Sequence, residues 1–239
     1  MATQCSYFDN IVVMKDKTIA LLMALLMSAT AMAQVLQISG DGNPLNSING
    51  NYWVDLGLSV RWSTRNLGAS SYDKPGDYYA WGETSVKETY TRENCKTNSI
   101  TFDIQGNQNY DPVATKWGNG WRMPTMDEFV ELVLNCDWKW ICTENYIGAL
   151  GVSKKNGESI FLPAEGYMFN GKTIEKEIVG YYWSANHDLK YSDNQAKGLT
   201  FFSTAIKTYQ GPKDKEIVFN DPELEKCYGM LIRPVIDKD

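Results

Sequence analysis

Alternating apolar and polar residues at positions 60–65 indicate a half-buried β-strand near the start of the folded part of the chain. Val60 and Trp62 fall on one face, and polar or charged residues fall on the other. This two-residue period is typical of a strand with one face toward a core. We expect the strand to pair with residues 52–56 through a turn at Gly57.

A helix is predicted to begin at Thr125. Thr125 and Glu128 have the spacing of a capping box, in which the threonine hydroxyl and the glutamate satisfy free backbone N–H groups at the helix start, and Pro124 precedes them. The residues expected on its apolar face are Phe129, Leu132, Val133 and Cys136. Beyond the helix, Trp138 and Trp140 alternate around a lysine.

Short apolar segments separated by Gly, Asn and Lys fill the second half of the chain. The strands expected there are residues 159–162, 181–184, 198–202 and 228–235. No internal repeat is found. The pattern therefore predicts an α+β fold with few helices, short and mostly antiparallel strands, and long loops.

Residues 1–33 are predicted to be an upstream extension followed by a secretory signal peptide. A lysine-containing region precedes an apolar run at residues 18–27, and Ala31-Met32-Ala33 supplies a cleavage sequence before Gln34. The run is about half of the ~20 residues that span a bilayer, so no transmembrane segment is expected after cleavage. We expect export to the periplasm, the cell surface or the medium, with a buried helix as the alternative for this run.

The remaining chain is expected to hold a linker at residues 34–50, rich in Gly, Asn, Ser and Asp, and a single domain at residues 51–239. Of the 239 residues, 43% are hydrophobic and 22% charged, which is typical of a folded domain. The net charge of -6 leaves no basic surface for phosphates, so no nucleic-acid partner is expected. His187 is the single histidine, which excludes a zinc site with several imidazoles.

Four cysteines follow the predicted cleavage site, an even number in a chain predicted to enter an oxidising compartment. They are Cys95, Cys136, Cys142 and Cys227. Two disulfides with three alternative pairings are compatible with this set. Free buried thiols are compatible as well, because a domain of about 200 residues can bury enough apolar surface without cross-links. The close Cys-x-x-Cys spacing of structural zinc sites is absent, so no metal is expected there.

An ordered set of short motifs resembles the Fibrobacter major paralogous domain family, which is common in exported proteins of Bacteroides-like bacteria. In the first half the motifs are YWVDLGLSVRW (52–62), NLGA (66–69), GDYYAWGET (76–84) and WRMPT (121–125). In the second half they are CDWKW (136–140), IFLPA (160–164), GYYWS (180–184) and IRPV (232–235). Each motif is weak alone, but together they cover residues 51–236 in the family's order.

The resemblance implies a C-type lectin-like fold, in the branch that also holds the formylglycine-generating enzymes. It implies that the first and last strands pair, so that residues 52–56 lie near residues 231–235, and that ligands meet irregular loops of the second half. Two features depart from the family. Arg65 stands where relatives often carry a cysteine, which argues against a family disulfide at Cys136, and residues 207–227 are longer than usual.

Catalytic and metal chemistry have little support in the sequence. The formylglycine activity requires a pair of reactive cysteines, and only Cys227 lies near the end of the domain. Ser184, His187 and Asp188 are too close in sequence for a catalytic triad, so we expect His187 in a solvent-exposed loop. The Glu-Pro-Asn motif of calcium-dependent lectins is absent. No cofactor is therefore expected; a structural calcium ion is compatible with the sequence but has no motif behind it.

Aromatic residues give the remaining clue to function. Eight tryptophans and fourteen tyrosines could stack on sugar rings. Most lie in the motifs above and are expected in the core, but a few lie in loop-like sequence, namely Tyr167, Phe169, Tyr191 and Tyr209. The ligand-contacting residues predicted from the second-half loops are Asn186, His187, Tyr191, Asn194 and Tyr209.

These observations predict a secreted or cell-surface, non-enzymatic protein that binds a glycan or a host or bacterial surface protein through loops between residues 181 and 227. One alternative is a structural subunit of a surface assembly of the fimbrial-tip type, which concentration-dependent assembly or a free strand edge would favour. The other is an enzyme of the formylglycine-generating type, which a reactive and exposed Cys227 would favour.

Overall fold

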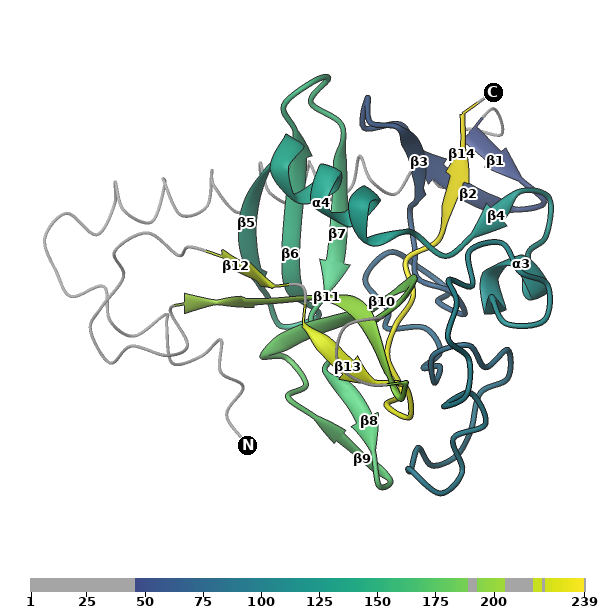
Figure 1. Cartoon of the computed structure of the whole chain (residues 1–239). Helices are drawn as coiled ribbons and strands as arrows, with labels where there is room; N and C mark the ends of the chain where they lie inside the picture. Colours follow the sequence, from purple (N-terminus) through teal and green to yellow (C-terminus); the bar gives the residue numbers. More distant parts are fainter. Residues whose placement is uncertain (1–45, 189–192, 205–216, 221, 239) are drawn as a thin grey trace, which may run out of the picture.

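The computed structural model describes residues 46–188, 193–204, 217–220 and 222–238 (Figure 1). Within these residues the chain forms mostly antiparallel β-sheets and two α-helices. The predicted sheet-rich α+β class with few helices is therefore confirmed. No helix in the described part of the chain is long and apolar enough to cross a membrane.

One sheet joins the beginning and the end of the described chain. Its five strands lie in the order β1-β2-β3-β14-β4. Their bounds are Ser47–Ile48 for β1, Asn51–Val54 for β2, Val60–Ser63 for β3, Trp121–Arg122 for β4 and Val235–Asp237 for β14. β2 and β3 form the predicted hairpin, with Val54 opposite Trp62. Because β2 occupies one edge of β3, β14 pairs with the other edge and with β4. The implied pairing of the first and last segments is thus corrected to a pairing of β14 with β3.

A second sheet contains β5 (Cys136–Cys142), β6 (Ile147–Ser153) and β7 (Ser159–Pro163) in that order. Trp140 is buried and Trp138 is half-buried. The six-membered ring of Trp138 lies against Gly151 on β6, where a Cβ atom would come within 2.7 Å of it. A glycine at this position therefore allows the indole to cover the sheet.

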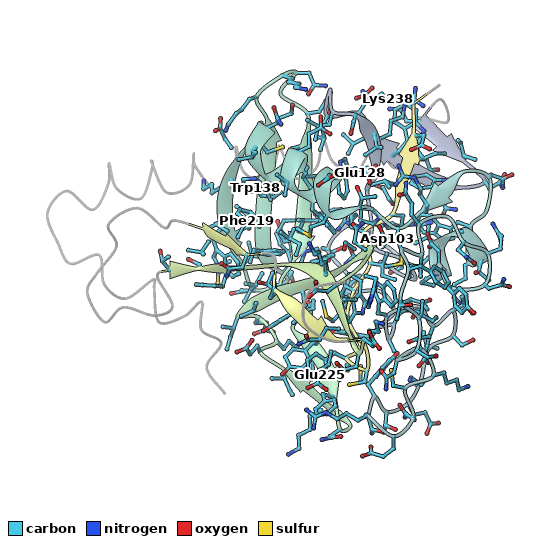
Figure 2. All side chains as sticks on the ribbon, viewed as in Figure 1. Asp103, Glu128, Trp138, Phe219, Glu225 and Lys238 are labelled. Atoms are coloured by element: carbon cyan, nitrogen blue, oxygen red, sulfur yellow. The ribbon has the colours of Figure 1, made fainter. Side chains whose placement is uncertain are left out.

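Two long antiparallel strands, β10 (Val179–His187) and β11 (Gln195–Ser203), form the centre of a third sheet. They contain the strands predicted at residues 181–184 and 198–202. β12 (Ile217–Asn220) and β13 (Glu223–Glu225) both pair with β11. Phe219 on β12 packs against Trp138 on β5 with ring centroids 4.9 Å apart, so these two sheets are in contact (Figure 2). A short hairpin of β8 (Tyr167–Phe169) and β9 (Lys172–Ile174) lies beside them (Figure 1).

The helices are α3 (Pro112–Lys116) and α4 (Met126–Asn135). The predicted capping box is present at α4: the Thr125 hydroxyl accepts from the Glu128 N–H, and the Glu128 carboxylate accepts from the Thr125 N–H. The predicted apolar face of α4 is directed into the core through Phe129 and Leu132. The predicted strand start for residues 228–235 is wrong, because a regular strand begins only at residue 235.

The core consists of two main groups of buried side chains. One surrounds Trp62 and Phe129 and joins α4 to β3, β7 and β11. The other surrounds Trp81, Trp121 and Trp183 and lies under the long segment 64–111, which contains no helix or regular strand. Backbone bonds such as the one from the Tyr79 N–H to the Met230 carbonyl, at 2.9 Å, fix that segment against the end of the chain. The irregular part of the molecule therefore rests on a packed interior.

Candidate functional site

His187 does not lie in an exposed loop as predicted. It is the last residue of β10, with only 4% of its surface exposed. The pairing of β10 with β11 shifts register between Trp183 and His187, and the His187 ring lies 6.1 Å from that of Trp81. Burial lowers the pKa of His187, and the charge of Lys226 lowers it further. The imidazole is therefore a neutral core group near pH 7.

The triad considered above is not assembled. The Ser184 hydroxyl donates to the Lys197 carbonyl at 2.8 Å. His187 Nδ1 lies 3.1 Å from the Gln195 carbonyl oxygen. Both side chains are thus engaged with the backbone of β11.

The side chain of Asn186 also makes its hydrogen bonds within the protein. Its side-chain oxygen accepts from the Met126 N–H at the start of α4, at 2.6 Å, and its side-chain nitrogen donates to Asp103 at 2.8 Å. Asn194 is exposed, and its carbonyl accepts from the Lys226 N–H at 2.9 Å. The remaining predicted contacts, Tyr191 and Tyr209, lie outside the described residues. The described members of the predicted site therefore do not converge on a ligand-binding surface.

Lys226 places an ammonium group inside this buried region. It is fully buried, and its ammonium group donates to the carbonyl oxygens of Ile100 and Asp193. The same group lies 4.9 Å from the centroid of the Trp81 ring. Burial lowers the pKa of Lys226 to about 8. Lys226, which follows β13, therefore connects the turn between β10 and β11 to the long segment 64–111.

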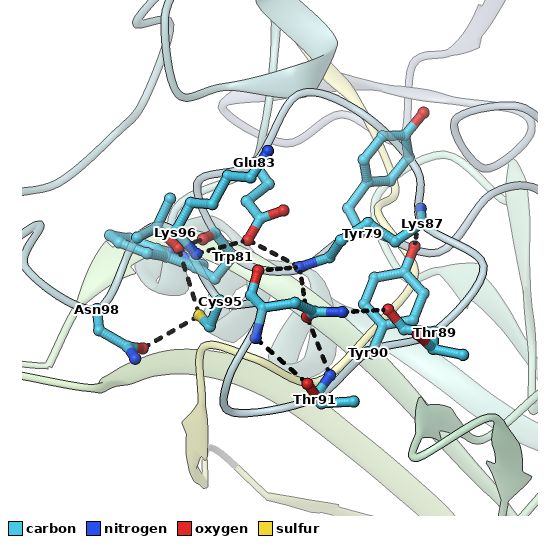
Figure 3. A network of polar contacts seen from close by, with 12 residues as sticks. Tyr79, Trp81, Glu83, Lys87, Thr89, Tyr90, Thr91, Cys95, Lys96 and Asn98 are labelled. Carbon is cyan, nitrogen blue, oxygen red and sulfur yellow. Dashed lines mark hydrogen bonds and ion pairs between the residues drawn. The ribbon is translucent and has the colours of Figure 1, made fainter.

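A polar network fixes the outer part of that long segment (Figure 3). Glu83 accepts from Lys87 and from the Lys96 N–H, both at 2.9 Å. The ammonium of Lys87 also donates to the carbonyl and side-chain oxygens of Asn94, each at 3.1 Å. Glu83 therefore holds a turn together, which is a structural role for a carboxylate.

The cysteines do not form the two disulfides considered above, because Cys95, Cys136 and Cys227 are all free thiols. Cys136 and Cys227 are buried, and burial raises the pKa of each to about 12. Cys227 also lies 3.5 Å from a Glu225 carboxylate oxygen, which disfavours its thiolate further. A thiol of this kind is a poor nucleophile at neutral pH.

A surface of four half-buried aromatic side chains lies where β8, β10 and the chain after β13 meet. We call it the aromatic patch; its members are Tyr167, Phe169, Tyr181 and Tyr228. Tyr167 and Phe169 alternate with Met168 along β8 and so share one face. Met168 bridges Gly229, which brings both rings to Tyr228. The prediction that Tyr167 and Phe169 lie in a loop is therefore wrong, but both side chains are half-buried and thus partly accessible.

Ring-to-ring contacts fix the patch. Tyr167 lies 4.9 Å from Tyr181 and 4.9 Å from Tyr228, and Phe169 lies 5.1 Å from Tyr228. The tilted and edge-to-face angles are those that aromatic rings prefer. Tyr167, Phe169 and Tyr181 lie on strands, and each contacts another ring of the patch, so the rings present a surface with little rotamer freedom.

Charged side chains border the aromatic patch. Arg92 makes a two-pronged ion pair with Glu225, with both distances 2.6 Å, and lies 5.8 Å from the Phe169 ring centroid. The Tyr181 hydroxyl donates to Glu175. Burial raises the pKa of Tyr228 to about 12, and Glu225 adds to this effect. The tyrosine hydroxyls are therefore neutral donors beside carboxylate acceptors.

A separate polar pocket of 220 Å³ lies between three turns. It is lined by residues 73–75, by residues 143–147 at the turn from β5 to β6, and by Glu165, Lys176 and Glu177. None of the predicted ligand contacts lines it. Among the described residues, no group of three or more His, Cys, Asp or Glu side chains has an arrangement that could hold a metal ion.

Comparisons of the chain with protein-family models, with curated proteins and with solved structures gave no match. The family and the lectin-like fold implied by the sequence motifs therefore stay predictions, and the function is argued from the surfaces described above.

Proposed function

We propose that the protein is a non-enzymatic binding module, exported from the cell, that holds a glycan on the aromatic patch. The observation that supports this proposal is the set of four half-buried rings fixed by contacts of 4.9–5.1 Å. Tyrosine offers a large and rigid contact area at a low cost in conformational entropy. Such rings provide apolar faces for the C–H groups of a sugar.

The border of the patch supplies the polar half of glycan recognition. Glu175 and Glu225 are acceptors for sugar hydroxyls. Arg92 is a fixed donor because Glu225 holds its Nε and Nη2 groups, so that Nη1 can donate to a ligand. Ligand sites commonly combine aromatic walls with a few oriented polar groups of this kind. Tyr181 lies within the part of the chain that the sequence assigns to binding, whereas Tyr167, Phe169 and Tyr228 lie outside it.

Binding is favoured over catalysis by the state of Cys227. The formylglycine-type alternative needs a reactive thiol near the end of the domain. Cys227 is instead buried, next to a carboxylate, and has a raised pKa. This environment is opposite to the electropositive and partly exposed sites in which reactive cysteines occur.

A glycan array probed with the purified protein, with and without calcium, tests the proposal. We expect saturable binding that Tyr167→Ala weakens at least tenfold, a loss of about 1.4 kcal/mol. Tyr52→Ala is the matched control, because Tyr52 is also half-buried but lies on β2 at the opposite end of the molecule (Figure 1). Thermal unfolding of both variants tests whether the fold is retained.

Two outcomes would contradict the proposal. Binding that Tyr52→Ala and Tyr167→Ala weaken equally would remove the aromatic patch from the site. Absence of binding to every glycan, together with concentration-dependent assembly, would favour the surface-subunit alternative. Loss of binding without calcium would support the structural ion that the sequence leaves open.

A further inference from the structure

The polar pocket has room for one small group and not for a whole ligand. Its 220 Å³ is below the roughly 300–1,000 Å³ of pockets that enclose drug-sized molecules. Three separate turns form its walls, and each is fixed by backbone bonds. The Glu177 N–H donates to the Ala164 carbonyl at 2.7 Å, and the Thr143 N–H to the Tyr146 carbonyl at 3.0 Å. A ligand entering it would meet a pocket that is already formed.

Hydrogen-bond acceptors dominate the walls of the pocket. Its lining includes four carboxylates and two lysines. Lys74 is 2.9 Å from Asp73, and Lys176 is 3.6 Å from Glu165. The two remaining carboxylates, Glu144 and Glu177, have no ion-pair partner in the described part of the chain. The pocket is therefore net negative, and its cations are already engaged.

Glu165 is the most enclosed of these carboxylates, with 13% of its side chain exposed. Burial raises the pKa of Glu165, and the nearby Glu177 raises it further, while Lys176 and Lys74 lower it. Burial leaves the ionised Glu165 carboxylate poorly solvated, so an added cation would stabilise it.

An aromatic ring completes the lining. Tyr146 lines the pocket and is held by Phe161 and Tyr72, with ring centroids 5.2 and 6.2 Å away. Carboxylates together with an aromatic ring are the groups that bind ammonium ions in proteins, through charge-assisted hydrogen bonds and cation–π contact.

We infer that the polar pocket binds a primary ammonium group and so selects glycans that carry an amino sugar with a free amine. This inference rests on the proposed glycan binding. One chain segment links the two surfaces: Glu175 binds Tyr181 in the aromatic patch, while the next two residues, Lys176 and Glu177, line the pocket. Residues 175–177 therefore contribute to both surfaces, and on this inference a glycan chain that rests on the rings places one amine in the pocket.

The test is calorimetric titration of the full chain with a β-1,4-linked tetramer of glucosamine and with its fully N-acetylated counterpart. We expect the free-amine tetramer to bind at least tenfold more tightly. Glu165→Gln and Glu177→Gln should each reduce its affinity about tenfold, because each removes a charged acceptor. Glu158→Gln, an exposed residue at the opposite end of β6, is the matched control and should leave the affinity unchanged.

Two results would overturn the inference while glycan binding is retained. One is equal affinity for the two tetramers, and the other is unchanged affinity in both pocket variants. If neutral glycans bind and Tyr167→Ala abolishes this binding while the amine has no effect, the inference fails and the proposed function stands. If neither tetramer nor any other glycan binds, the proposed function fails, and the inference fails with it.

Discussion

At the scale of single residues, the interior is organised by two buried cations that are bound mainly by carbonyl oxygens. Arg233 is fully buried and donates to the Ser63 and Phe161 carbonyls at 3.1 and 2.8 Å and to the Asn66 side chain at 2.8 Å. No carboxylate pairs with it among the described residues. Its role is therefore to satisfy three acceptors on two segments, residues 63–66 and β7, that meet in the core.

Arg233→Lys should destabilise the protein by about 2–4 kcal/mol. A lysine keeps the charge, but a single ammonium cannot reach three acceptors that a planar guanidinium bridges, and each unpaired buried acceptor costs about 1–3 kcal/mol. Urea denaturation measures the change. Arg92→Lys, at an exposed ion pair, is the control and should change the free energy of unfolding by less than about 1 kcal/mol. Equal effects would show that Arg233 is not a bridging group.

Lys226 should make the stability of the protein rise with pH under mildly alkaline conditions. Burial lowers its pKa from 10.5 to about 8 in the folded state. Between these two values the unfolded chain binds more protons than the native one, so the free energy of unfolding increases with pH by at most about 1.4 kcal/mol per unit.

The measurement is urea denaturation of the wild type and of Lys226→Met at pH 7.5, 8.5 and 9.5. The stability difference between the two should grow with pH. The comparison with Lys226→Met is needed because Cys136 and Cys227, whose pKa values are raised, make the free energy of unfolding decrease as the pH rises. A constant difference would contradict a lowered pKa for Lys226.

At the scale of elements, the capping box fixes where α4 begins. Thr125→Ala should cost about 1 kcal/mol, because the Glu128 N–H loses its acceptor. Thr125→Ser keeps the hydroxyl and should cost less than half as much. Chemical denaturation compares the two variants. If serine and alanine are equally destabilising, the lost methyl group and not the cap explains the effect.

Local signals made α4 and the β2–β3 hairpin predictable, because a capping pair and strict alternation act over a few residues. The β8–β9 hairpin was missed although its signal is present: Asn170 and Gly171 both have positive φ, of 50° and 71°. An Asn-Gly pair between short strands favours such a two-residue turn. Tyr167 and Phe169 were consequently assigned to a loop.

The wrong prediction of a ligand-binding loop at Asn186 and His187 has a different cause. The polar run around Asn186 and His187 resembles a loop in sequence, yet it lies at the end of β10. The pairing of β10 with β11 shifts register there, the Asn186 side chain binds Asp103, and the buried His187 ring contacts the backbone of β11. These partners are distant in the chain, and the aromatic patch and polar pocket likewise draw on distant segments. Patterns read over short windows cannot reveal such contacts.

At the scale of the whole molecule, the last strand closes the fold. β14 lies between β3 and β4, each of which is more than 100 residues away in the sequence. Val235 and Ile236 are buried, while Asp237 and Lys238 make ion pairs with Arg122 and Asp55 at the rim. The sheet is therefore completed only after the full chain is available, which is a long-range pairing of the kind that slows folding.

Removal of residues 235–239 should abolish cooperative unfolding. The deletion leaves the facing edges of β3 and β4 unpaired in the interior and exposes apolar side chains of both core groups. The matched control is the double variant Asp237→Asn and Lys238→Gln, which loses only rim ion pairs and should lose less than about 2 kcal/mol. Circular dichroism during heating distinguishes the two variants. If β14 holds β3 and β4 together, the truncated chain alone should lose its signal gradually. A sharp transition in the truncated chain would mean that β14 covers a fold that is already complete.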